Sequence, residues 1–491
     1  MERVLAVTDS TQFSAISRAL AIVMLGLALA LFAAVGPKPA LVALGAAVFL
    51  VCAFALPLQA SLKFYFFYLF IDGALKILSN YNPILHVGQD IFLLCLLFRV
   101  FTGANFRWAE WAKTPFFLLF LLFASSVFVQ YLNPFSLGIL PSLAGTKVYL
   151  SGIMLFFLIF HCVRAAEIRG LCAWIVFLGV AQGALALTEY FIFPEQIFQL
   201  HPKYAQIAGD KFIGDLYRPF GTTTSPGAPS VWIFLCTPFA LYLLSYGRTL
   251  RIRFLCLAFF ALGLPTLLVC QTRAAMVLTA LMVAAFFCAP AGRRWLRFGT
   301  LALLLGAAAL HFGPGLYQGS LKNSLLDLGL EPLKAEQLNL RLLTLLDPVT
   351  YVTSRRGATD KILELAEITP FGIGLSRVGA ASAVWKDRIA NDLEFGKEWA
   401  FADNVYRAIF TELGIFGLFT WLLLVVSISI FLVRKSWVSK VQGRRAFLFI
   451  CGTIPLVVLA GGWGSEGIMY MPVSAFLWAS LAMGCKESVY V

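Results

Sequence analysis

The sequence predicts an all-α membrane protein: a polytopic helical bundle of about fourteen spans with a large, partly helical loop facing outward. Three observations support this prediction. The chain of 491 residues is 60% hydrophobic and only 13% charged, whereas soluble domains average about 25% charged residues. Apolar runs recur along the whole chain, and a spanning helix needs roughly 20 mainly apolar residues. Helices are expected for these runs because lipid satisfies no backbone polar group.

The predicted spans follow the apolar runs in order. They lie near residues 17–35, 40–58, 62–79, 83–100, 115–132, 148–163, 171–192, 230–247, 254–272, 275–290, 299–313, 405–433, 446–462 and 468–484. The run at 62–79 carries Asp72 and Lys76 and could instead lie in the membrane interface. No small-residue cleavage site closely follows the first run, so we interpret it as a retained span.

The net charge of +13 could suggest a nucleic-acid partner, but its distribution does not. Lys and Arg gather in loops that alternate with loops poor in both, which is the pattern of positively charged cytoplasmic loops. This predicts cytoplasmic termini and no nucleic-acid site. Residues 1–491 then form a single transmembrane domain with two insertions on the far side, a shorter one at 193–229 and a larger one at 314–404.

Cysteine and motif usage excludes several kinds of site. All ten cysteines lie inside or beside predicted spans, so we expect free thiols rather than a disulfide framework. No CxxC motif or Cys/His cluster suggests a metal. No GxSxG, HExxH or nucleotide-binding signature is found. The sequence therefore predicts neither a metal nor a cofactor.

The two insertions differ in character. Residues 193–229 are rich in Gly, Pro and Thr, which favours an irregular loop that returns toward the membrane. Within 314–404, the segment 357–369 has apolar residues at rough helical spacing, which predicts a short amphipathic helix. The segment GIGLSRVG at 372–379 resembles a phosphate loop only superficially and is interpreted as a turn.

Candidate site residues gather on the predicted outer face. They are Arg273 at the end of a span, Arg218 in the shorter insertion, Arg355 and Arg356 before the amphipathic helix, and Asp403 and Asn404 before the span at 405–433. A guanidinium group makes bidentate bonds to phosphate oxygens and stays charged. Several arginines on one face therefore suggest a diphosphate held at the level of the lipid headgroups.

Three of the candidates, Arg218, Arg355 and Asp403, have a simpler alternative. A lone interfacial arginine such as Arg218 or Arg355 can snorkel or bind lipid headgroups. Arg273 has apolar runs on both sides, where charge tends to be functional or paired. Asp403 could cap the following helix, or pair with Arg407 one helical turn later.

Four segments together resemble the O-antigen ligase/polymerase superfamily. They are YRPFGTTTSPGAPSVW, QTRAAM, RRGATDKILELAEITPFGIG and ADNVYRAIFTELGIFGL. The similarity covers about residues 205–425, and the order and spacing of the segments carry more weight than any one of them. The flanking spans match only in being hydrophobic.

The resemblance implies a metal-independent glycosyltransferase of the bacterial inner membrane. Its donor would be a polyprenyl-diphosphate-linked oligosaccharide in the outer leaflet, and a flippase and a chain-length regulator would be partners besides membrane lipid. The span-end arginine and the loop arginine of the family match Arg273 and Arg356 (or Arg355). With Asp403, Arg273 and Arg356 are the expected catalytic residues. Arg218, Arg355, Asn404 and Arg407 are the expected substrate-binding residues.

The position of Asp403 favours the polymerase branch of this superfamily. Ligases of the family typically carry a histidine there, whereas Asp-Asn is common in polymerases. A ligase that transfers the glycan to a lipid A core or to a protein is the alternative enzyme. A polysaccharide flippase would be a different class of protein, but it should line its midplane with charges and have short loops.

Overall fold

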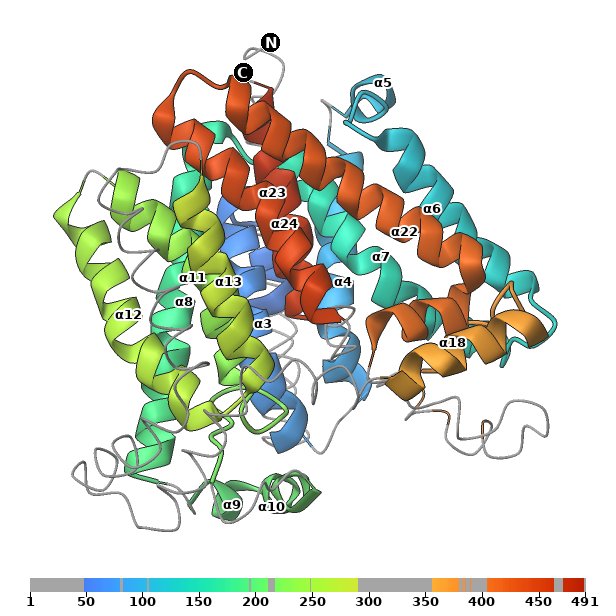
Figure 1. Ribbon diagram of the computed structural model, residues 1–491, viewed down its shortest axis with the longest axis horizontal. Coiled ribbons are helices and arrows are strands. Elements are labelled where there is room, and N and C mark those ends of the chain that lie inside the picture. Colours follow the sequence, from blue (N-terminus) through green and yellow to red (C-terminus); the bar gives the residue numbers. More distant parts are fainter. Residues whose placement is uncertain are drawn as a thin grey trace, which may run out of the picture.

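The computed structural model of the chain consists of helices joined by loops (Figure 1). It describes residues 48–79, 83–103, 106–193, 196–210, 217–247, 249–289, 356–378, 382, 385, 389, 404–462 and 471–489. All regular secondary structure within these residues is α-helix or short 3-10 helix. The predicted all-α class is confirmed for this part of the chain.

Six helices are long and apolar enough to cross a membrane. They are α7 (Ile139–Cys162), α8 (Ala165–Phe191), α11 (Pro229–Tyr246), α12 (Leu250–Cys270), α22 (Val405–Val438) and α23 (Gln442–Gly462). Each corresponds to a predicted span, although α7 begins at Ile139 rather than near residue 148. These helices have apolar residues on all sides, because both the bundle interior and lipid accept apolar side chains.

Five further helices cover other predicted spans but are shorter or less apolar. They are α3 (Leu58–Leu78), α4 (Pro83–Phe101), α6 (Phe117–Val129), α13 (Arg273–Cys288) and α24 (Val473–Ser488). The predicted spans at 17–35 and 299–313 lie outside the described residues, as do residues 40–47 of the predicted span at 40–58. The total of about fourteen spans therefore stays a prediction.

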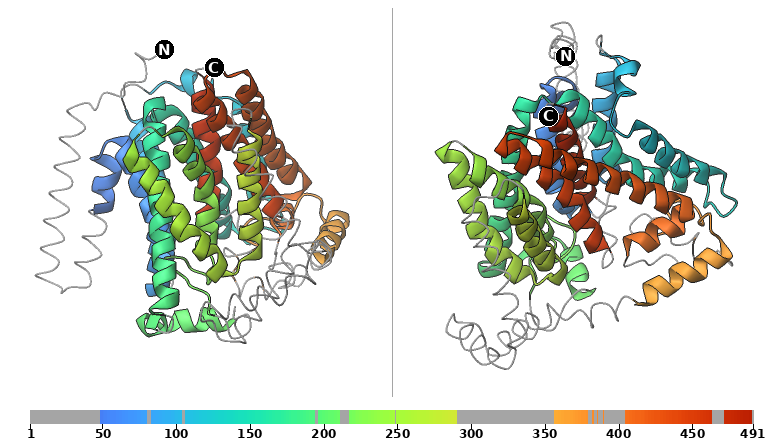
Figure 2. Two further views of the ribbon diagram at one scale, coloured as in Figure 1. Left: turned by 60° about the vertical axis from the view of Figure 1, so that its left-hand side comes forward. Right: turned by 45° about the horizontal axis from the view of Figure 1, so that its top comes forward.

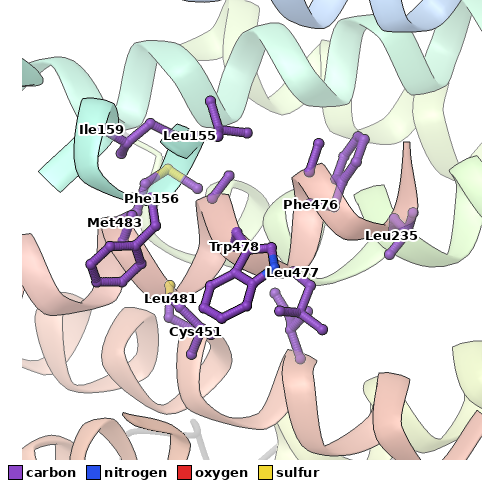
Figure 3. Packing of buried hydrophobic residues seen from close by; sticks show 14 of the residues in the cluster. Leu155, Phe156, Ile159, Leu235, Cys451, Phe476, Leu477, Trp478, Leu481 and Met483 are labelled. Atoms are coloured by element: carbon purple, nitrogen blue, oxygen red, sulfur yellow. The ribbon is translucent and has the colours of Figure 1, made fainter. Parts of the chain in front are cut away.

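The helices form two groups joined by a central pair (Figures 1 and 2). In one group α8, α11 and α12 pack on one another and α13 packs on α11; in the other, α22 packs on α6. The central pair, α23 and α24, contacts both groups: α23 packs on α13 and α22, and α24 packs on α7. Trp478 and Phe476 of α24, with Phe156 of α7, fill the core at this junction (Figure 3).

The short helices mark the two ends of the bundle. Helices α9 (Gln196–Leu200), α10 (Pro202–Asp210) and α18 (Arg356–Ile368) lie at one end, which we call the loop end (Figures 1 and 2). Helix α5 (Trp108–Trp111) and the last turn of α24 lie at the opposite end. The predicted amphipathic helix at 357–369 is present as α18.

Helix α22 is broken near the loop end, which the predicted span at 405–433 did not anticipate. Gly414 has φ 70° and ψ −170°, so residues 405–413 and 415–438 form two arms of α22. The segment after α18 fills the break: the Ile415 amide donates to the Pro370 carbonyl (2.9 Å), and the Ile373 amide donates to the Thr411 carbonyl (2.8 Å). A Cβ on Gly414 would lie 2.4 Å from the Phe371 carbonyl carbon. Only glycine accommodates both the dihedral angles and this contact.

Candidate functional site

Arg218 is held at the junction of α12 and α13. Its Nε donates to the Cys270 carbonyl, and its Nη2 donates to the Thr272 hydroxyl, each at 2.9 Å. Arg273, which follows Thr272 in the chain, is the first residue of α13, and its side chain is exposed. The structure therefore brings two predicted arginines, Arg218 and Arg273, to one place at the loop end of the bundle.

The loop 217–228 closes around the Arg218 guanidinium. Gly227 has φ +78°, and a Cβ there would lie 2.2 Å from Arg218 Nη2. The Gly227 amide donates to the Pro219 carbonyl (2.8 Å), and the Thr272 hydroxyl donates to the Gly227 carbonyl (3.0 Å). Arg218 is thus fixed by contacts on both sides, unlike a side chain that snorkels freely into the headgroups.

Glu189, near the end of α8, anchors the start of the same loop. Its carboxylate accepts hydrogen bonds from the amides of Phe220 (2.8 Å) and Gly221 (2.6 Å) and from the Tyr217 hydroxyl. Burial and the adjacent carboxylate raise the pKa of Tyr217, so its hydroxyl remains a donor. The sequence shows Glu189 as one of several carboxylates in apolar runs, and the structure identifies its function as a loop anchor.

A second group of predicted residues lies at the start of α22. Asn404 is fully buried and caps the helix, since its Oδ1 accepts from the amides of Tyr406 (2.8 Å) and Arg407 (3.2 Å). The cap predicted as an alternative for Asp403 is therefore supplied by Asn404. The Asn404 Nδ2 has no hydrogen-bond partner among the described residues. Arg407 is also buried, in the first turn of the short arm of α22.

The side chains of three predicted site residues lie outside the described part of the structure. Arg355 and Asp403 lie outside the described residues. Arg356 is the first residue of α18, but its side chain is outside the described part of the structure. Its backbone position puts it at the loop end, where α9 and α10 also lie (Figure 1).

The pair Arg218 and Arg273 and the residues at the start of α22 are linked through the last turn of α23. Leu278 of α13 lies over Gly461, where a Cβ would meet its Cδ1 at 2.6 Å. The Tyr406 hydroxyl of α22 donates to the Leu459 carbonyl at 2.6 Å. The helix that begins with Arg273 and the helix capped by Asn404 therefore pack on the same turn.

Glu412 holds the segment after α18 against the bundle. Its Oε2 accepts from the Tyr149 hydroxyl of α7 (2.7 Å), and its Oε1 accepts from the Val378 amide (2.9 Å). Gln130 Nε2 donates to the Phe371 carbonyl (3.0 Å) on the same segment. The segment predicted to be a simple turn, 372–379, is buried from Gly372 to Val378.

Arg377 and Tyr149 were not singled out from the sequence. The Arg377 guanidinium is buried and donates to the carbonyls of Phe135 and Ile373. A charged residue in a short Gly-rich segment was the available signal for Arg377. Tyr149 gave none, because a tyrosine in an apolar span is ordinary.

Two carboxylates on α3 and α4 are paired inside the bundle. Asp72 contacts Lys76 at 2.5 Å on α3, and Asp90 of α4 contacts Lys147 of α7 at 3.2 Å. The Ser151 hydroxyl also donates to Asp90 Oδ1 at 2.6 Å. Each acid has a basic partner, as buried charges require, and α3 packs on α4 and α8 within the bundle.

Comparisons and composition together define the class of protein but not a family. No protein-family model matches the chain, and no curated protein is significantly similar to it. Among the described residues, no group of three or more His, Cys, Asp or Glu side chains could hold a metal ion. The length and hydropathy of its helices identify the chain as a multi-pass helical membrane protein.

Proposed function

We propose that this protein polymerises lipid diphosphate-linked oligosaccharide repeat units into O-antigen or exopolysaccharide at the outer face of the bacterial inner membrane. The observation that carries the proposal is the fixed guanidinium of Arg218, bonded to Thr272 at 2.9 Å beside the exposed Arg273. Two cationic groups at one end of a membrane bundle suit a diphosphate at headgroup level. The resemblance to the O-antigen ligase/polymerase superfamily supports the same substrate.

In this proposal the arginines stabilise the leaving group. The acceptor hydroxyl oxygen bonds to the anomeric carbon of the donor sugar, the bond to the diphosphate breaks, and polyprenyl diphosphate departs. Arg273 and Arg356 (or Arg355) offset the negative charge that develops on the diphosphate, while Arg218 binds substrate from its fixed position. Asp403 accepts the hydroxyl proton. Asn404 and Arg407 contribute to acceptor binding.

The proposed orientation puts the loop end outside. Helix α22 ends and α23 begins at the opposite end of the bundle (Figure 1). The last turns of α22, the segment that follows it and the first turn of α23 carry Arg434, Lys435, Lys440, Arg444 and Arg445. Basic residues favour the cytoplasmic side, which supports cytoplasmic termini. The donor would then come from a flippase, and a chain-length regulator would act on the product.

Buried charges of the described helices argue against a transporter. Asp72 and Asp90 are neutralised by Lys76 and Lys147. A transport pathway requires charges that line a water-filled route near the midplane. Arg218 and Arg273 instead lie together at one end of the bundle.

The test is polymer formation by the purified full-length chain in nanodiscs. The substrate is the lipid-linked repeat units extracted from a strain that lacks this gene. The wild-type protein should yield a ladder of products, and Arg273→Ala should abolish it. Arg273→Lys should recover little activity, because an ammonium group cannot make the bidentate contact. Arg253→Ala is the control, since Arg253 is exposed near the start of α12, at the opposite end.

Two results would contradict the proposal. A normal ladder from both Arg273→Ala and the double replacement Arg355→Ala/Arg356→Ala would eliminate the diphosphate site. Transfer of one intact glycan to an added lipid A core, without a ladder, would establish the ligase alternative.

A further inference from the structure

We infer that α18 is a membrane-interface helix, whose outer apolar side chains and the adjoining Phe371 contact the acyl chains of the bilayer. This inference does not depend on the proposed enzymatic activity. It concerns a surface that the sequence analysis attributed to the large outward-facing loop. The partner is the lipid bilayer at the boundary between headgroups and acyl chains.

The rest of the protein covers only part of the apolar face of α18. Leu365 is buried, and Ile362 and Ala366 pack beside it against Ile373 and Phe410. Leu363 and Ile368 are apolar as well, but they are 62% and 57% exposed.

Two exposed acidic side chains, Glu364 and Glu367, lie on the polar side of α18. At about 100° per residue, Leu363 and Ile368 flank these two glutamates on opposite sides. An amphipathic helix with exposed apolar side chains at both edges of its polar face is suited to a membrane interface.

The exposed apolar surface continues from α18 onto a predicted span. Phe371 is 73% exposed. The bond of 2.9 Å from the Ile415 amide to the Pro370 carbonyl places it beside the long arm of α22. Ile415, Phe416 and Phe419 are also exposed there.

This continuity identifies the partner of the surface. The spacing of Ile415, Phe416 and Phe419 puts them on one side of α22, and α22 is one of the six helices able to cross the membrane. The exposed side of such a helix faces lipid, and Phe371 extends that side to α18. An apolar surface of this extent is unusual in contact with water.

The inference has a consequence for Arg356. As the first residue of α18, it is held near the headgroup layer by the rest of the helix. Its height in the membrane is then set by Ile368, at the other end of the helix, and by Phe371, three residues beyond that end.

A spin-label scan in nanodiscs of phosphatidylethanolamine and phosphatidylglycerol tests the inference. Nitroxide labels are introduced one at a time at cysteines replacing Leu363, Ile368 and Phe371, in a background without reactive native cysteines. Labels at Glu364 and Glu367 serve as water-facing controls, and a label at Phe419 serves as the lipid-facing control. Collision rates with oxygen, which concentrates in lipid, and with a water-soluble nickel chelate are measured at each position.

Labels at Ile368 and Phe371 should match the label at Phe419, with high oxygen and low nickel accessibility. The label at Leu363 should also be more accessible to oxygen than to nickel. Glu364 and Glu367 should show the reverse. Nickel accessibility at Ile368 and Phe371 equal to that of the glutamates would overturn the inference. Low accessibility to both reagents would also overturn it, because a protein surface, such as a second copy, would then cover the patch. Gel filtration verifies each labelled variant, and Phe371→Cys alone suffices if Ile368→Cys fails to fold.

Discussion

The Tyr149 hydroxyl donates a hydrogen bond of 2.7 Å to the Glu412 carboxylate, although 263 positions separate the two residues in the chain. The second carboxylate oxygen accepts from the Val378 amide at 2.9 Å. One buried side chain therefore ties together α7, the short arm of α22 and the segment that follows α18. Asn404 caps the short arm and Arg407 lies in its first turn, so this contact anchors the arm that carries two predicted substrate-binding residues.

Replacing Tyr149 by Phe should loosen the segment 369–378. The change leaves a buried carboxylate oxygen without its hydroxyl donor, which costs about 1–3 kcal/mol. Thermal unfolding in detergent should occur at a lower temperature, and amide hydrogen exchange should increase in 369–378. Tyr131→Phe is the matched control, because the Tyr131 hydroxyl bonds only to Thr146 (2.9 Å) among its described contacts. Equal effects of the two substitutions would show that Glu412 does not hold the segment.

Gly414→Ala should destabilise the break in α22. A non-glycine residue at φ 70°, ψ −170° stores about 1–3 kcal/mol of backbone strain, and the new methyl group would also meet Phe371. The expected result is low yield of folded protein on gel filtration. Gly443→Ala should be tolerated, since a Cβ there meets Tyr246 only at an ordinary 3.5 Å. Wild-type yield and melting temperature for Gly414→Ala would mean that the break is not required.

Gly227→Ala should displace the Arg218 guanidinium while the bundle stays intact. The added Cβ would lie 2.2 Å from Nη2, so the side chain must leave Thr272. Under the proposed function, polymer formation should fall at least as far as in Arg218→Lys, with normal membrane insertion. The assay is the nanodisc reaction, with Thr272→Ser, which keeps the hydroxyl acceptor, as the control. Unchanged activity in Gly227→Ala would remove Arg218 from the substrate site.

Asp403→Asn separates catalysis from helix capping. Asn404 already caps α22, so the substitution should leave thermal stability unchanged. If Asp403 is the base, the rate should fall by about 10²–10⁴. Asn404→Ala should instead lower stability by about 0.5–2 kcal/mol, the usual value of an N-cap. A fully active Asp403→Asn enzyme would leave the arginines as the whole catalytic apparatus.

The sequence predicts those features that depend on local composition. Apolar runs located the six spanning helices, and helical spacing in 357–369 located α18, because each pattern is contained within one element. Residue chemistry also selected Arg218 and Arg273, which the structure brings together. The function drawn from the resemblance stays a prediction.

Features that depend on distant contacts could not be predicted. Gly414 and Gly417 stand in the same apolar run, yet only Gly414 leaves the helix, because the Pro370–Gly372 backbone packs against it. Likewise the partners of Arg218 are a carbonyl and a hydroxyl more than 50 residues away, at Cys270 and Thr272. The ion pair of Asp90 with Lys147 spans two helices, and no local pattern joins them.

That ion pair bears on how the chain enters the membrane during synthesis. Asp90 emerges from the ribosome well before Lys147, so α4 must initially be accommodated without the partner that neutralises it in the finished bundle. An acidic residue at the centre of an inserting helix costs roughly 2.5–3.5 kcal/mol. In helix α3 the pairing of Asp72 with Lys76 within one helix offsets part of this penalty. The free energy of inserting α4 into the bilayer therefore becomes more favourable once α7 has been made. The membrane insertion of the two helices is thus coupled.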